Sequence, residues 1–285
     1  MTSHASQTAG AAHWRVSYEG PQSGQFNMAV DEALLCEVSE AQAPPQTHLR
    51  FYQWRCPTVS LGLSQKPEQV INLDYCRSHG IEIVQRPTGG KAVLHDRELT
   101  YSVVSNDSAF FPSANIGKTY CRIASALQRG FRLLGLETTL AAETGKRSAT
   151  GPLSSACFAL SGHHEVLWQG RKLVGSAQRR RKNAFLQHGS ILIDFDVTSL
   201  SRVLRSCESA LLSSAVADLK TCLGTVPPVG ALVEALSKGF EAAFAVRLVE
   251  DGPRTDVLVR FGRRANASKF SPIGAGGGNR CPRPL

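Results

Sequence analysis

The amino-acid sequence predicts an α+β fold, with mixed, largely antiparallel sheets flanked by helices. Segments with the composition of β-strands outnumber amphipathic helical segments along the chain. Several of these strands come in pairs that are joined by short glycine-containing or polar turns, as in hairpins. The strands do not alternate regularly with helices, which argues against a parallel sheet built from repeated βαβ units.

The first half of the chain contains both kinds of element. Asn27 is a candidate N-cap for a helix over residues 28–40, where apolar residues recur at helical spacing. Pro67 is expected to begin a second helix, which ends at Gly80, because proline is favoured at the first helical position and glycine just after the last. The expected strands are rich in β-branched and aromatic residues and cover 13–18, 48–54, 58–61, 81–84 and 99–104.

The second half continues the same pattern. A long amphipathic helix is expected over 116–134, with Gly135 just after its end. The other expected elements are strands over 137–140, 165–168, 172–179 and 184–193 and helices over 197–206 and 229–243. The sequence therefore predicts a disordered leader over 1–12, one large domain over 13–250, and a basic, flexible tail over 251–285.

Composition narrows the functional classes. The 285 residues are 42% hydrophobic and 19% charged, as in globular proteins, and no apolar run is long enough to cross a bilayer. The N-terminus lacks the pattern of an export signal, so a cytoplasmic protein with no membrane partner is expected. The eight cysteines form no Cys-x-x-Cys pair, so no metal site is expected. The net charge of +9 comes without a recognition motif and does not favour nucleic acid as a partner.

The stretch that carries most chemistry is residues 86–96, with the sequence RPTGGKAVLHD, between two expected strands. The glycine pair permits positive φ and close approach of a ligand to the backbone. Arg86 and Lys91 flank the glycines with positive charge, and His95 returns the chain toward the same region. Adjacent backbone N–H groups and cations suit a phosphate or a developing oxyanion, although a plain hairpin connection is the simpler interpretation.

Two further glycine-containing stretches follow, residues 170–178 (GRKLVGSAQ) and 187–192 (QHGSIL). Together with 86–96 they suggest the walls of one pocket. These three motifs, in this order, resemble the lipoate–protein ligase A/biotin ligase superfamily, and the segment 27–34 (NMAVDEAL) is similar to the first helix of that family. The resemblance covers roughly residues 13–250 and implies the biotinyl/lipoyl transferase-like fold.

Within that superfamily, residues 155–158 (SACF) resemble the cysteine loop of the octanoyltransferases. The resemblance implies transfer of octanoyl from acyl carrier protein to a lysine of a lipoyl domain, such as glycine cleavage H protein. It assigns the nucleophile to Cys157 and the pocket lysine to Lys172. A nearby ammonium lowers the pKa of a thiol, which makes this pairing chemically reasonable. No cofactor is required, because the thioester donor is already activated.

The remaining candidate site residues are expected to bind the substrate. Backbone N–H groups near Gly89-Gly90 or Gly175-Ser176 could hold the oxyanion, while His95 and His188 could shape the pocket or relay protons. The basic run 179–182 is either a solvated turn or a contact for the acidic carrier protein. The substrate-binding set is Arg86, Thr88, Gly89, Gly90, His95, Gly175, Ser176, Ala177, His188 and Gly189.

Three alternatives to octanoyl transfer stay open. An ATP-dependent lipoate ligase would use the same glycine loop and Lys172 without needing Cys157. An amidotransferase would move octanoyl between two lipoyl domains through the same cysteine. A nucleic-acid-binding or scaffold protein without activity would agree only with the sequence pI near 9.3 and the basic tail.

Overall fold

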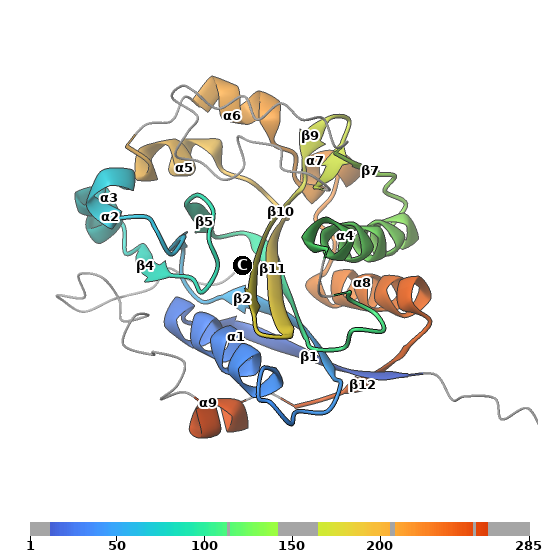
Figure 1. Cartoon of the computed structure of the whole chain (residues 1–285). Helices are drawn as coiled ribbons and strands as arrows, with labels where there is room; N and C mark the ends of the chain where they lie inside the picture. Colours follow the sequence, from blue (N-terminus) through green and yellow to red (C-terminus); the bar gives the residue numbers. More distant parts are fainter. Residues whose placement is uncertain (1–11, 113–114, 142–164, 206–208, 253–254, 262–285) are drawn as a thin grey trace, which may run out of the picture.

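A computed structural model of the chain describes residues 12–112, 115–141, 165–205, 209–252 and 255–261, and it confirms the predicted α+β class (Figure 1). The strands of its largest sheet are β1 (His13–Gln22), β2 (Thr47–Trp54), β6 (Glu98–Ser105), β10 (Val174–Arg181), β11 (Ala184–Leu192) and β12 (Arg247–Glu250). Their order across the sheet is β10-β11-β6-β2-β1-β12. β1 is parallel to both of its neighbours, and the other pairs are antiparallel.

The pairing register of this sheet places one set of side chains in a row. Tyr52 of β2 lies opposite Thr100 of β6, Thr100 lies opposite Ser190 of β11, and Ser190 lies opposite Gly175 of β10. Directly opposite residues point to the same face of a sheet. The row therefore forms part of one continuous surface across four strands.

One face of the large sheet is covered by α4 (Ile116–Leu133) and α8 (Val229–Phe244). Alternate strand residues point to this side, because the side chains of a strand alternate between its two faces. Phe51, Tyr101 and Phe185 belong to the same buried cluster as Phe131 of α4 and Phe240 of α8. This cluster is the main hydrophobic core.

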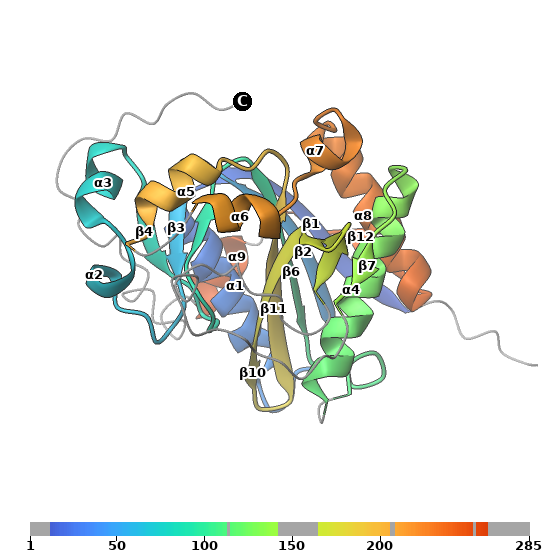
Figure 2. The same ribbon diagram turned by 90° about the horizontal axis from the view of Figure 1, so that it is seen from above.

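The opposite face carries α1 (Gly24–Val38) and a second, smaller sheet (Figures 1 and 2). The small sheet contains β3 (Thr58–Leu61), β4 (Glu82–Gln85) and β5 (Val93–His95), in the order β4-β3-β5. The sequence predicted a simple loop between the strands at 81–84 and 99–104. In the structure β5 lies between these two strands along the chain and pairs with β3. Residues 86–92 therefore connect β4 and β5, which are the two edge strands of the small sheet.

The other described elements lie around these two sheets. A third sheet is formed by β7 (Thr139–Leu140), β8 (Val166–Trp168) and β9 (Arg171–Lys172). The remaining helices are α2 (Pro67–Val70), α3 (Leu73–Ser78), α5 (Val197–Val203), α6 (Ser209–Ala215) and α7 (Leu219–Leu223). The sequence did not predict α6 and α7, which have only 7 and 5 residues and too few turns for a periodic pattern.

One predicted helix start was wrong, and the helix predicted to begin at Pro67, where α2 does begin, is interrupted. α1 begins at Gly24, and Ser23 is its N-cap, because the Ser23 side chain accepts a hydrogen bond from the Phe26 N–H at 3.2 Å. Asn27 instead donates from Nδ2 to the Gln53 carbonyl at 3.0 Å. The helix expected from Pro67 to Gly80 is divided into α2 and α3, and the Asn72 side chain caps α3.

The segment predicted as a flexible tail contains one described helix, α9 (Thr255–Phe261). Val257 of α9 is fully buried in a cluster with Val30 and Leu34 of α1. An apolar contact with α1 thus holds this part of the tail. The predicted boundary at residue 250 and the predicted leader over 1–12 stay predictions.

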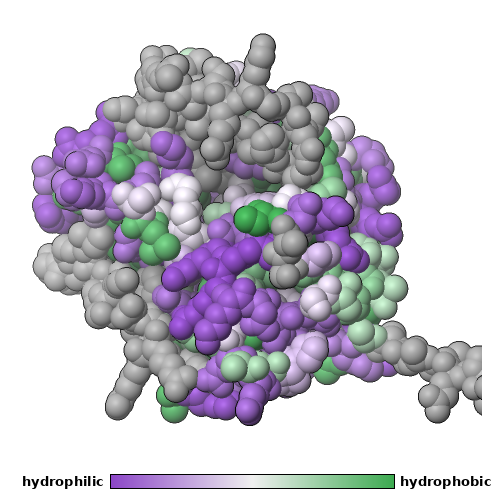
Figure 3. Space-filling model, viewed as in Figure 1, coloured by the Kyte–Doolittle hydropathy of each residue, from purple (hydrophilic) through white to green (hydrophobic). Residues whose placement is uncertain are grey.

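Figure 3 shows that hydrophilic residues cover much of the face over α1 and the β10–β11 hairpin. Along the described residues, no helix combines the length and the apolar character that crossing a membrane requires.

Candidate functional site

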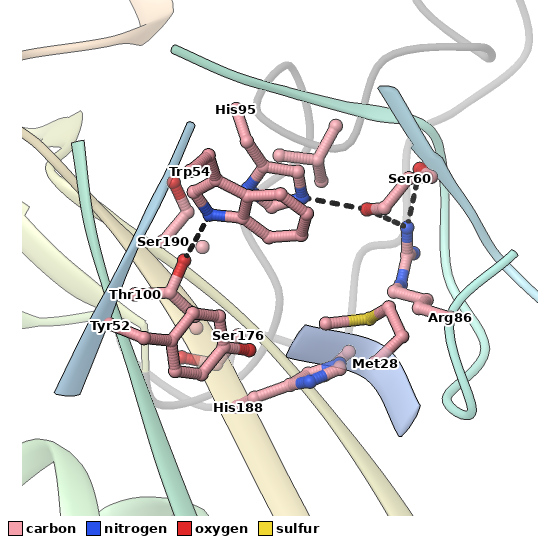
Figure 4. A pocket seen from close by; sticks show the side chains of 14 residues that line it. Met28, Tyr52, Trp54, Ser60, Arg86, His95, Thr100, Ser176, His188 and Ser190 are labelled. Carbon is pink, nitrogen blue, oxygen red and sulfur yellow. Dashed lines mark hydrogen bonds between the residues drawn. The ribbon is translucent and has the colours of Figure 1, made fainter. Parts of the chain in front are cut away.

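A pocket lies between the large sheet, the small sheet and α1 (Figure 4). The glycine-containing stretches 86–96, 170–178 and 187–192 all contribute to its wall, as their motifs suggested. The lining residues are Met28, Tyr52, Trp54, Ser60, Arg86, Val93, His95, Thr100, Gly175, Ser176, Ala177, His188, Gly189 and Ser190.

The floor of the pocket is the face of the large sheet that points away from α4 and α8. Thr100 and Ser190 lie next to each other on this face, and His188 follows along β11. Their neighbours on the edge strand β10 are Gly175 and Ala177, which have small side chains or none. The small residues of β10 leave the space above the sheet open.

Gly189 and Ser176 belong to the alternate set of strand residues, whose side-chain positions point to the face of the large sheet that carries the main core. The Ser176 hydroxyl lies 2.8 Å from the Tyr101 hydroxyl, and Tyr101 is part of the main core. A Cβ atom at Gly189 would lie 2.5 Å from Tyr101 Cε1 and 2.9 Å from the Gly175 carbonyl oxygen. Glycine is therefore required at 189, because the Tyr101 side chain of β6 and the backbone of β10 both come close to this position of β11.

Arg86 is buried and holds the glycine loop. Its Nη2 donates to the carbonyl oxygens of Gly89 and Lys91, both at 2.7 Å, and its Nε donates to the Thr88 hydroxyl at 3.2 Å. Its Nη1 donates to the carbonyl and the hydroxyl of Ser60, at 2.9 and 3.2 Å. The N–H donors of the guanidinium are thus directed to the protein itself rather than into the pocket.

One chain of hydrogen bonds leaves Arg86 through Thr88. The Thr88 hydroxyl lies 2.7 Å from His188 Nε2, and His188 Nδ1 lies 2.9 Å from Asp31 Oδ2. Asp31 also accepts from Arg50 at 2.5 Å and from the Tyr52 hydroxyl at 3.0 Å. With Asp31 ionised, His188 donates from Nδ1 and accepts at Nε2.

Burial and charge set the protonation states along this chain. Burial alone would raise the pKa of Asp31, but the Arg50 guanidinium and the contact with His188 leave that pKa below its ordinary value. Burial lowers the pKa of His188 and outweighs the opposing effect of Asp31. At neutral pH the pair therefore consists of a carboxylate and a neutral imidazole.

A second, similar chain leaves Arg86 through Ser60. The Ser60 hydroxyl lies 2.7 Å from His95 Nε2, and His95 Nδ1 lies 3.1 Å from Glu98 Oε1. That carboxyl oxygen also accepts from the indole N–H of Trp54 at 2.8 Å. The rings of Trp54 and His95 are stacked, with centroids 3.9 Å apart. Arg86 is therefore the common end of two chains of hydrogen bonds. Each of them passes from a hydroxyl group to a histidine ring and then to a carboxyl group.

These networks determine what the pocket offers to a ligand. Both histidines use their ring nitrogens within the protein, as do the Trp54 N–H and the Tyr52 hydroxyl. What is left for a ligand is mainly ring faces and the aliphatic surfaces of Met28 and Val93. Such a wall suits an apolar group with few polar atoms.

Lys172 lies on β9 and does not line the pocket. It is buried, and its Nζ lies 2.6 Å from Glu165 Oε1. Burial raises the pKa of Tyr101 to about 12, and the Glu165 carboxylate acts in the same direction. Lys172 comes just before β10, the edge strand whose Gly175, Ser176 and Ala177 line the pocket.

Cys157 lies outside the described residues, so its predicted role as nucleophile stays a prediction. Among the described cysteines, Cys36, Cys76, Cys121 and Cys222 are free. Burial raises the pKa of both Cys76 and Cys222 to about 11. These two thiols are protonated at neutral pH and are poor nucleophiles.

The structure brings most of the predicted substrate-binding residues to this pocket, though not all in the same way. Thr88 lies behind the wall between Arg86 and His188, while Gly89 and Gly90 are in the loop, where Gly90 has φ +96°. The sequence analysis missed Asp31 and Glu98 behind the wall. It also missed the lining residues Met28, Tyr52, Trp54, Ser60, Val93, Thr100 and Ser190.

Two signals in the sequence could have identified some of these residues. Tyr52 and Trp54 are two residues apart in the strand predicted over 48–54, so they had to share one of its faces. Asp31 and Glu32 interrupt an apolar run from Met28 to Leu35, which is unusual for carboxylates without partners.

The basic run after Ala177 is bound to the protein in the structure. Arg179 donates to the Pro87 carbonyl at 3.1 Å, Arg180 to the Thr119 hydroxyl at 2.9 Å, and Arg181 to Cys36 Sγ at 2.9 Å. These side chains connect the hairpin to the glycine loop, α4 and α1. The description as a solvated turn was therefore wrong for these three arginines.

Known proteins resemble this chain over most of its length. The model of the lipoyl protein ligase A/B catalytic domain matches residues 23–241. Octanoyltransferase LipM of Kyrpidia tusciae is 38% identical over 244 residues, which cover 82% of this chain and 88% of that protein. Octanoyltransferase LipM of Geobacillus kaustophilus is 39% identical over 246 residues, which cover 82% and 87%.

Solved structures share the fold. A lipoate-protein ligase A bound with ATP superposes with a TM-score of 0.70 at 25% identity, covering 88% of this chain and 93% of that chain. A bi-partite lipoate protein ligase from Thermoplasma acidophilum gives the same TM-score at 24% identity, covering 89% and 91%. The sequence motifs, the pocket that they form and these matches agree, and the chain belongs to the lipoyl protein ligase A/B catalytic domain family.

Proposed function

We propose that this chain is an octanoyltransferase of lipoate biosynthesis. It takes octanoyl from octanoyl-acyl carrier protein, holds it on Cys157, and passes it to a lysine of a lipoyl domain such as that of glycine cleavage H protein. Relatives between 36% and 43% identical are named octanoyltransferases, which supports octanoyl as the group transferred. A cytoplasmic location stays a prediction from the sequence.

The observation that favours transfer over ATP-dependent ligation is the environment of Arg86. Arg86 is the cation among the described lining residues, and its guanidinium is hydrogen-bonded to Ser60, Thr88, Gly89 and Lys91. An adenylating enzyme has to neutralise phosphate charge at its site. The pocket wall is mainly apolar, and the N–H groups of its arginine are already hydrogen-bonded to the protein. Such a wall suits an acyl chain that arrives as an activated thioester.

The chemistry needs no ATP, metal or cofactor. The Cys157 thiolate attacks the thioester carbonyl, the C–S bond to the carrier breaks, and the carrier leaves as a thiolate that takes up a proton. The lysine amine of the lipoyl domain then attacks the acyl-cysteine, the new C–S bond breaks, and a stable amide forms. In this proposal the Lys172 ammonium favours the thiolate and takes part in the proton transfers.

Intact-mass spectrometry tests the covalent step directly. Incubation with octanoyl-acyl carrier protein, without ATP, is expected to add one octanoyl group to the wild-type protein and none to Cys157→Ala. Cys222→Ala is the matched control, because Cys222 is a free thiol whose pKa burial raises to about 11. Acylation of Cys157→Ala equal to that of the wild type would contradict the proposal.

The same assay separates the alternatives. Acylation of a lipoyl domain only when ATP and free octanoate are supplied would identify a ligase. Transfer from octanoylated H protein but not from the carrier protein would identify an amidotransferase. Salt-sensitive binding of DNA without any acyl chemistry would favour a nucleic-acid-binding protein.

A further inference from the structure

Ser190 carries a hydroxyl with no partner in the wall of the pocket. The residue is 3% exposed, and among the described residues its Oγ has no hydrogen-bond partner. Each of the other described lining side chains that has a hydrogen-bonding group makes a hydrogen bond. Burying a hydroxyl without a partner costs free energy, so such a group in a native structure calls for an explanation.

The register of the sheet explains why this hydroxyl has no partner within the protein. The residues directly opposite Ser190 are Thr100 on β6 and Gly175 on β10. The Thr100 hydroxyl accepts from the Trp54 N–H at 2.9 Å and donates its hydrogen to Glu98, so it has no hydrogen left to donate to Ser190. Gly175 has no side chain that could cover or bond Ser190. Figure 4 shows Ser190 close to Thr100 and Trp54 in the pocket.

We infer that the Ser190 hydroxyl donates a hydrogen bond to the carbonyl oxygen of the acyl group bound in this pocket. An acyl thioester has one strong hydrogen-bond acceptor, its carbonyl oxygen, and the rest of the acyl chain is apolar. Among the described side chains that line the pocket, the Ser190 hydroxyl is correspondingly the one donor that no protein group uses, on a wall of ring faces and aliphatic groups. This inference rests on the proposed function in that it takes an acyl thioester as the ligand.

The position of Ser190 also gives the hydroxyl a role in the reaction. Gly175, its neighbour on β10, comes shortly after Lys172, so Ser190 is paired with the beginning of the strand that follows the predicted catalytic lysine. Attack by sulfur converts the carbonyl oxygen into an oxyanion, which a hydrogen-bond donor stabilises more strongly than it stabilises the neutral carbonyl. Ser190 is therefore expected to act on the rate of the acylation step more than on substrate binding.

The kinetic test compares Ser190→Ala with Thr138→Val. Thr138 Oγ1 is also buried without a partner, but Thr138 does not line the pocket, so its variant controls for the loss of an unpaired hydroxyl as such. Ser190→Ala is expected to slow acylation by octanoyl-acyl carrier protein about 100-fold, with KM raised no more than about fivefold. Its melting temperature should not fall, because no hydrogen bond within the protein is lost. Wild-type acylation kinetics, or a slower reaction accompanied by a lower melting temperature, would overturn the inference.

A binding test decides the same point without turnover. In the Cys157→Ala background, the protein is titrated with S-octanoyl-pantetheine and with S-octyl-pantetheine, a thioether that lacks the carbonyl. Wild-type Ser190 should favour the thioester about fivefold, and Ser190→Ala should abolish that preference. A preference that survives in Ser190→Ala refutes the contact. Because this arm involves no transfer, it separates a failure of the Ser190 contact from a failure of the proposed octanoyl transfer.

Discussion

His188 Nδ1 lies 2.9 Å from Asp31 Oδ2, and this contact joins α1 to β11 at the wall of the pocket. The same carboxylate binds Arg50, which also pairs with Glu19 at 2.6 Å. A buried group of charges in the first third of the chain therefore sets the orientation of a histidine that follows much later in the sequence. The orientation of His188 depends on Asp31 as much as on its own strand.

Asp31→Asn is expected to destabilise the protein. It preserves the shape of the side chain but leaves Arg50 with one carboxylate and His188 without its anionic acceptor. Removing one partner of a buried pair typically costs about 3 kcal/mol or more in the free energy of unfolding. Urea denaturation measures this loss. Glu234→Gln, in an exposed pair with Lys238, is the control and should leave the urea midpoint unchanged. An unchanged midpoint for Asp31→Asn would contradict the role given to the pair.

Stability should fall as the pH falls from 7.5 to 5. Burial lowers the pKa of His188 in the folded state, so below about pH 6.5 the unfolded chain binds a proton that the folded protein does not. The unfolded state then holds more protons, and the free energy of unfolding decreases with decreasing pH, by at most about 1.4 kcal/mol per pH unit for one group. Comparison of urea midpoints for wild type and His188→Gln isolates this residue from the other histidines. Parallel pH profiles for the two proteins would show that His188 does not titrate as stated.

Gly189→Ala should distort the floor of the pocket. The added Cβ would meet Tyr101 at 2.5 Å and the Gly175 carbonyl oxygen at 2.9 Å, so the Tyr101 side chain and β10 would have to move away from β11. Overpacking of this kind typically costs about 1–3 kcal/mol. Gly230→Ala is the matched control, since a Cβ there meets nothing within 4 Å, and alanine is favoured in a helix. Thermal unfolding of the two variants gives the comparison, and equal melting temperatures would contradict the packing argument.

The Lys172–Glu165 pair allows the structural and chemical roles of the lysine to be separated. Lys172→Met leaves the Glu165 carboxylate buried without this partner and should destabilise the protein by about 3 kcal/mol or more. Adding Glu165→Gln removes that charge and should restore much of the stability. Under the proposed function acylation should stay lost in the double variant, because the ammonium beside the nucleophile is still missing. Recovery of both stability and acylation would reduce Lys172 to a structural residue.

The sequence by itself determined the class of fold and the family. Strand and helix periodicity depends on neighbouring residues along the chain, so β2, β6, β11, α4 and α8 were predicted close to their observed bounds. The three glycine-containing motifs identified the walls of the pocket for the same reason, since each motif lies within a few consecutive residues. Short helices such as α6 and the two-residue strand β9 are too brief to leave a periodic signal.

Only the tertiary structure decided how the site is held together. Arg86 looked like a free cation in the sequence, but its loop folds back so that the carbonyl oxygens of Gly89 and Lys91 accept its N–H groups. Likewise, the partners of His188 and Ser190 follow from strand register and from the packing of α1, which join residues far apart in the chain. A register shift by one residue would turn Ser190 to the opposite face of the sheet. No local pattern contains that information, because hydrogen bonds across strands are set by which segments the whole fold brings together.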